Sequence, residues 1–179
     1  MLFRSPPRQN GGPALLTPAE VHALRRRAGR GAGRAVVKVV IAGGGPLARR
    51  AALARFATLP GFTAEAEGAP VEFGTLGRIT MGEGLHADLV ALPSDPALAP
   101  LWRPFAAGAV GALLLLPADG VAAPLAELSR ALRLPAGACA PSEEALAAAL
   151  GRPAAEVAFL GGDPAEALRA LLADASRRG

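Results

Sequence analysis

A segment rich in β-branched residues, 36–42, constrains the fold more than any other feature, because three glycines follow it directly. Apolar runs of this length are typical of a strand that is covered on both faces. Residues 47–59 have apolar side chains at helical spacing, and Pro60 with Gly61 ends that pattern. The sequence therefore predicts a buried strand, a glycine-rich turn at 43–45 and an amphipathic helix, in that order.

The glycine-rich turn lies where a phosphate-binding loop of the G-x-x-x-x-G-K-[ST] type would begin. Such a loop needs a second glycine for close backbone approach, a lysine on the β- and γ-phosphates and a hydroxyl on the magnesium ion. In this chain those three positions are Ala48, Arg49 and Arg50, and the only lysine, Lys38, precedes the turn. The order of elements fits the motif, but its three defining residues are missing.

Each replacement weakens a different part of such a site. Ala48 adds a Cβ where the backbone should approach phosphate, and Arg49 replaces a compact ammonium by a long planar guanidinium. Arg50 places a cation where a neutral oxygen should bind the metal, so ordinary magnesium binding is not expected. Two interpretations stay open: a tight turn without a ligand, or a vestigial phosphate loop. The candidate residues of that loop are Gly43, Gly44, Gly45, Ala48, Arg49 and Arg50.

The rest of the chain alternates strands and helices. Gly82 and Gly84 join two strand-like segments into a predicted hairpin, and Ser142 and Asp163 are good N-cap residues for later helices. This order predicts an α/β three-layer sandwich with a mainly parallel six-stranded sheet, one antiparallel edge strand and helices on both faces. The expected elements are a hairpin of 71–81 and 85–92, helices at 97–107, 121–132, 143–150 and from 164 onward, and strands at 110–116, 136–140 and 157–160.

Length and composition indicate one domain with a tail. The 179 residues suffice for one domain with a proper core, and no apolar stretch reaches the ~20 residues of a membrane span. We expect no secretory signal, because the arginines near the N-terminus are not followed by an apolar segment. Cys139 is the only cysteine and His22 and His86 the only histidines, so neither an internal disulfide nor a Cys/His metal cluster is expected. A reduced, cytoplasmic setting fits this composition.

Positive charge is concentrated in residues 1–34, which carry a net +6 against −2 for the rest of the chain. We therefore divide the sequence into a flexible basic tail, 1–34, and a folded domain, 35–176. The tail is either a solvated leader or a contact for acidic lipid, nucleic acid or an acidic partner. The folded body is not expected to bind nucleic acid, because it lacks an excess of basic residues.

Within this tail the sequence predicts disorder, a short helix and a hinge. Residues 1–16 have too few large apolar groups to compensate for chain ordering, so disorder is expected there. Thr17 and Glu20 form a capping-box pattern, which predicts a short helix to about Arg27. The glycines that follow, at positions 29, 31 and 33, are expected to form a flexible hinge.

The order of the predicted elements resembles that of Ras-like small GTPases. The middle of the chain is similar to the bacterial branch that includes the gliding-polarity GTPases and the conservon-type ATP/GTP-binding proteins. Residues 77–81 match its pattern G-R-I-T-L, residues 89–95 match L-F-G-T-P-G-Q, and an L-W and a G-A follow at 101–102 and 108–109 without a gap. The resemblance covers about residues 35–175 and implies a small G domain with a P-loop NTPase-like fold.

The same alignment shows which nucleotide-binding elements are absent. Ser94 takes the place of the glycine that meets the γ-phosphate, and Asp95 that of the water-positioning glutamine. The base-reading N-K-x-D motif should follow the strand at 136–140, where Pro141 and Ser142 lead directly into the next helix. The lysine and the magnesium ligand of the phosphate loop, the water-positioning glutamine and the base-reading motif are missing together, which indicates a lost function.

The resemblance implies a pseudo-GTPase scaffold that acts through protein contacts in bacterial signalling or polarity. It needs no cofactor, metal or catalytic residue, and its implied partner is a roadblock-type regulator or a sensor kinase. By analogy with the switch regions, the contact surface would lie along the hairpin edge and the adjoining segment, although Trp102 and Phe105 also have the spacing of a core pair. The candidate partner-binding residues are Glu72, Phe73, Arg78, Pro93, Asp95, Trp102 and Phe105.

Two other functions stay open. The first is a nucleotide- or phosphate-binding switch, or an NTPase, in which Arg49 and Arg50 hold the phosphates of GTP or ATP without magnesium. Hydrolysis is harder to reconcile with the sequence, because the water-positioning group and the metal ligand are missing. The second is an electrostatic adaptor that acts through residues 1–34.

Overall fold

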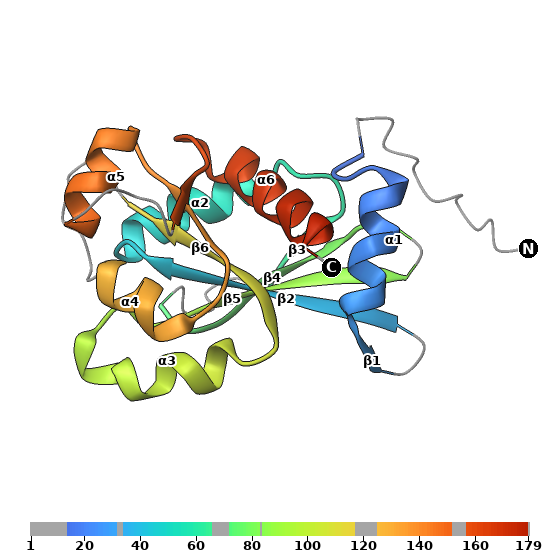
Figure 1. The fold of residues 1–179 in the computed structure, drawn as a ribbon. Coiled ribbons are helices and arrows are strands. Elements are labelled where there is room, and N and C mark those ends of the chain that lie inside the picture. The colour runs from blue at the N-terminus through green and yellow to red at the C-terminus, as the bar shows by residue number, and fades with distance from the viewer. Residues whose placement is uncertain are drawn as a thin grey trace, which may run out of the picture.

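The computed structural model describes residues 14–31, 34–65, 72–82, 84–116, 125–151 and 157–178. The described helices are α1 (Pro18–Arg27), α2 (Pro46–Phe56), α3 (Ala99–Ala106), α4 (Leu125–Leu132), α5 (Glu143–Leu150) and α6 (Pro164–Arg177), with a 3-10 turn η1 (Pro96–Leu98). The described strands are β1 (Gly29–Gly31), β2 (Arg34–Gly43), β3 (Phe62–Ala64), β4 (Gly74–Thr80), β5 (Leu85–Ala91), β6 (Ala109–Leu115), β7 (Ala136–Cys139) and β8 (Val157–Phe159). Helices cover both faces of a single sheet (Figure 1).

The predicted buried strand, β2, lies in the middle of the sheet. It pairs in parallel with β5 on one side and with β6 on the other, and β7 and β8 continue the sheet in parallel beyond β6. Across the sheet the five parallel strands lie in the order β5, β2, β6, β7, β8. Numbered by their order in the chain this is 2-1-3-4-5, which is a doubly wound order. The predicted α/β architecture with a mainly parallel sheet and helices on both faces is confirmed.

The predicted count of six strands was wrong, whereas the sheet does have the predicted antiparallel edge. The described part of the chain has eight strands rather than six, because β1 pairs with β2 and β3 pairs with β4. That antiparallel edge consists of two strands, because β3 pairs with β4 on its outer side. Both added strands have only three residues and lack the continuous apolar run that revealed the equally short β8.

Side chains of β2 alternate between two cores. Val39 and Ile41 belong to the core under α1, α2 and α6, whereas Val40 and Ala42 belong to the core under α3, α4 and α5. All four side chains are fully buried. A strand with both faces covered needs apolar side chains at successive positions, which is why this segment has no polar alternation near its end.

The N-terminal region belongs to the folded body from residue 14 onward. The capping box of α1 is confirmed, because Thr17 Oγ1 accepts a hydrogen bond from the Glu20 backbone N–H and the Glu20 carboxylate accepts one from Thr17 N at 2.8 Å. That backbone hydrogen bond lowers the pKa of Glu20. Leu15 and Leu24 are buried in the same core as β2, and α1 packs against α6 (Figure 1).

The expected flexible tail therefore does not include residues 14–31. Of the glycines that were expected to form a hinge, Gly29 and Gly31 belong to strand β1, and Gly33 lies outside the described residues. Residues 1–13 of the expected disordered segment lie outside the described residues.

Local signals elsewhere agree with the structure. The hairpin is β4–β5. Ser142 is the N-cap of α5 and its Oγ accepts a hydrogen bond from Ala145 N at 3.1 Å, and the left-handed Gly151 is the C-cap of that helix. The first residues of the predicted helix 121–132 lie outside the described residues, and α4 begins at Leu125. Among the helices of the described ranges, none combines the length and hydropathy that a bilayer crossing requires.

Candidate functional site at the carboxyl edge of the sheet

The connection from β2 to α2 is a two-residue turn. Gly43 and Gly44 have left-handed backbones with φ of 75° and 62°, and Gly45 is the N-cap of α2. Pro46 occupies the first helical position, where its fixed φ and missing N–H favour helix initiation. Because the helix starts there, Ala48 and Arg49 lie in α2 and not in a loop that could wrap a phosphate group.

Arg49 points back from α2 to the carboxyl edge of the sheet, and its side chain is only 1% exposed. Its Nε donates to Gly43 O at 3.0 Å, its Nη1 to Glu72 O at 2.8 Å and its Nη2 to Ser94 Oγ at 2.7 Å. Ser94 Oγ in turn donates to Gly44 O at 3.1 Å. We call these residues, Gly43, Gly44, Arg49, Glu72 and Ser94, the arginine cluster.

The arginine cluster holds a charge in a desolvated place. Burial lowers the pKa of Arg49 to about 10, and the nearby charge of Glu72 acts in the opposite direction. The guanidinium therefore stays protonated at neutral pH. A buried cation is tolerated only when its donors are paired, and here two carbonyls and one hydroxyl accept from it. Those acceptors belong to three separate segments of the chain, which Arg49 joins.

The cluster includes only part of the predicted phosphate loop. Gly43, Gly44 and Arg49 are brought together in it, whereas Gly45 and Arg50 are exposed. Ala48 is partly buried on another side of α2. The sequence did not reveal the acceptors of Arg49, because Glu72 and Ser94 are 23 and 45 residues away along the chain.

Two candidate partner-binding residues are part of the core instead. Trp102 is 1% exposed, and its Nε1 donates to Pro93 O at 2.8 Å, so the prediction that these two residues face a partner was wrong. The other interpretation of its spacing, that Trp102 is a core residue, is the one that holds, because Trp102 and Ala106 are buried on the inner side of α3. A buried indole needs an acceptor for its N–H, and the Pro93 carbonyl supplies it.

Phe73 and Phe105 lie together at the surface. They are 39% and 37% exposed, and their rings meet edge to face with centroids 4.6 Å apart. Leu98 and Leu101 are exposed to a similar degree. Leu101 follows Leu98 by three residues and Phe105 follows it by seven, which places the three side chains on the same side of η1 and α3. We call these residues, Phe73, Leu98, Leu101 and Phe105, the aromatic face.

The remaining candidates are charged residues at the surface. Glu72 is exposed beside Phe73, and Arg78 forms an ion pair with Asp88 across the β4–β5 hairpin. Asp95 is exposed, and its Oδ1 accepts from Ala97 N at 2.9 Å, which caps η1. Asp95 therefore has a structural role at the start of η1.

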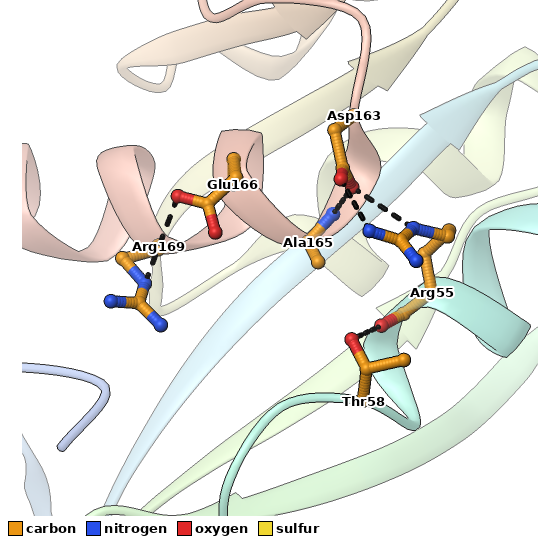
Figure 2. Close-up of polar contacts among 6 residues, drawn as sticks. All are labelled: Arg55, Thr58, Asp163, Ala165, Glu166 and Arg169. Carbon is orange, nitrogen blue, oxygen red and sulfur yellow. Dashed lines mark hydrogen bonds and ion pairs between the residues drawn. The ribbon is translucent and has the colours of Figure 1, made fainter. Parts of the chain in front are cut away.

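An ion pair that the sequence did not reveal joins α2 to the start of α6 (Figure 2). Arg55 donates to both carboxylate oxygens of Asp163, at 3.3 and 2.5 Å, and Asp163 Oδ1 also accepts from Ala165 N at 2.9 Å. The hydrogen bond from Arg55 is the main cause that lowers the pKa of Asp163. The two partners are 108 residues apart, so nothing local in the sequence indicates the pair.

Comparison with protein families and with curated proteins gives no relative. No protein-family model matches this chain, and a search of the curated proteins finds no match. The resemblance to Ras-like small GTPases therefore stays a hypothesis, and the functional argument depends on the geometry of the site.

Proposed function

We propose that this protein is a nucleotide-free scaffold with the architecture of a small GTPase, which acts through protein contacts in bacterial signalling or polarity. The observation that carries the proposal is the arginine cluster. Ligands of doubly wound sheets bind at the carboxyl edge beside the strand where the order reverses, which here is β2. At that place Arg49 binds oxygen atoms of the chain itself.

The turn after β2 supports the same proposal. A phosphate loop binds its ligand through several backbone N–H groups that face a common centre. The turn has two residues, and Pro46 has no N–H to offer. Arg50, at the position of the metal ligand, is exposed.

The aromatic face is the proposed contact surface for a protein partner. Exposed aromatic side chains are frequent energetic centres of interfaces. Arg49 binds the backbone carbonyl of Glu72, which directly precedes Phe73. It also binds the side chain of Ser94. The residue before Ser94, Pro93, accepts the hydrogen bond that anchors Trp102 of α3. The guanidinium thus holds both segments that carry the aromatic face. In a GTPase a bound nucleotide orders such segments, and we propose that Arg49 does so permanently here.

Calorimetric titration with GTP and with ATP, each with magnesium and with EDTA, tests this proposal. We expect no heat of binding in any of the four titrations. Magnesium-dependent binding in the micromolar range would overturn the scaffold function. Binding of the partner implied by the resemblance, a roadblock-type regulator or a sensor kinase, would then have to be measured with and without nucleotide.

The second candidate function is a phosphate-binding switch that works without magnesium. One observation favours it, because no side chain in the described structure caps the N-terminus of α2 at Gly45, and helix N-termini attract anions. In this case GTP or ATP would bind equally well with magnesium and with EDTA. Loss of that binding in Arg49→Ala, with retention in Arg103→Ala on the exposed side of α3, would assign it to the cluster.

A further inference from the structure

A pocket of about 400 Å³ opens at the carboxyl edge on another side of α2 from the arginine cluster. Its walls come from α2, from the ends of β6 and β7, and from the start of α6. The described lining residues are Ala48, Ala51, Ala52, Arg55, Leu115, Leu116, Cys139, Ala140, Pro141, Gly162 and Pro164.

Short side chains keep this pocket open. Three alanines line its α2 wall, and Pro141 and Gly162 line the opposite side. Its volume falls within the 300–1,000 Å³ that is typical of small-molecule sites. Its place at the carboxyl ends of parallel strands is also where ligands of this sheet architecture bind.

The lining is almost entirely apolar. Burial raises the pKa of Cys139 to about 11, so its thiol is neutral at physiological pH and reacts slowly with thiol reagents. Arg55 is the one charged side chain among the described lining residues, and Asp163 neutralises it at the rim. A purine needs a carboxylate and an amide to read its edge, and the described walls have neither.

We propose that this pocket binds a small, uncharged and largely apolar molecule whose polar end, where present, lies at the Arg55–Asp163 rim. The proposal does not depend on the scaffold function, because the arginine cluster and the pocket share no residue. A charged ligand would lose its hydration inside the apolar walls without gaining a partner there.

The neutral, polarity-sensitive dye prodan is the probe for the test. We expect a saturable blue shift of its emission with one site per chain. Ala51→Trp should weaken this binding at least tenfold, because Ala51 is exposed, lines the pocket and is replaced by a ring that fills it. The matched control is Ala54→Trp, whose residue is exposed on the same helix outside the lining, and its dissociation constant should stay within twofold of the wild type.

Cys139 provides a second readout in the unmodified protein. It is the only cysteine of the chain and it lines the pocket, so its labelling by N-ethylmaleimide reports on this site alone. Saturating prodan should slow the labelling at least fivefold. This measurement keeps the proposal testable even where Ala51→Trp does not fold.

Three results would overturn the proposal. The first is the absence of a saturable blue shift, and the second is an unchanged labelling rate of Cys139 in saturating prodan. The third is equal binding by the two tryptophan variants together with loss of binding in Phe105→Ala, because the dye would then occupy the aromatic face.

Discussion

The carboxyl edge of the sheet is filled on one side of helix α2 and open on another. On one side Arg49 reaches over the end of β2 and fills the carboxyl edge with a guanidinium that three segments bind. On the other side alanines leave a pocket of about 400 Å³ with a neutral thiol in its lining. The difference teaches that side-chain length on a single helix decides which part of a strand edge is closed by the chain and which part stays open to a ligand.

Removing the guanidinium is expected to have the largest effect. Arg49→Ala should lower the free energy of unfolding by about 3 kcal/mol, because it leaves buried acceptors without a donor and opens a cavity. Urea unfolding followed by circular dichroism measures this loss. Arg50→Ala, at an exposed position of the same helix, should change stability by less than about 0.5 kcal/mol. Equal effects of the two variants would contradict the role given to the cluster.

The turn itself is the next test. Gly44→Ala should cost about 1–2 kcal/mol, because φ of Gly44 is +62° and the added Cβ would lie 3.0 Å from Ala48 Cβ. Gly45→Ala is the matched control, since its φ is −90° and no heavy atom lies within 4 Å of the added Cβ. Thermal unfolding compares the two. A Gly45 variant that is as unstable as the Gly44 variant would contradict the described turn.

A smaller loss is expected when only the hydroxyl of the cluster is removed. Ser94→Ala takes away one acceptor of Arg49 and the donor to Gly44 O, at a cost of about 1 kcal/mol. In the double variant with Arg49→Ala the two costs should not add, because the residues are in contact. Strict additivity in urea unfolding would show that the hydrogen bond between them has no energetic weight.

The smallest expected effect is a pH dependence on the pocket side. The folded pKa of Asp163 is lowered from its ordinary 3.8, so the ion pair stabilises the fold above that pH and loses its contribution as the pH falls through the folded pKa. Asp163→Asn keeps an N-cap for α6 but removes the charge. This titration falls within about pH 5 to 2.5. Thermal unfolding across that range should show a smaller loss of stability on acidification in the variant than in the wild type. Identical acid profiles would contradict the link through Arg55.

Much of the fold could be predicted because its signals are local. Three such signals were confirmed, and each depends on residues close together in the sequence. They are the apolar run before Gly43, the capping box at Thr17 and the N-cap at Ser142. Strands β1 and β3 were missed because neither has the apolar run that revealed the equally short β8. Trp102 shows the limit of spacing, since a helix position alone does not say whether its side chain faces the core or a partner.

The sequence by itself determined the order of strands and helices and the absence of the usual phosphate-loop residues, because both depend on residue types at fixed neighbouring positions. Only the tertiary structure decided where Arg49 points, which faces of α3 are buried and that a pocket borders Cys139. These features join segments tens of residues apart, and their contacts form only when the sheet brings the carboxyl ends of its strands together.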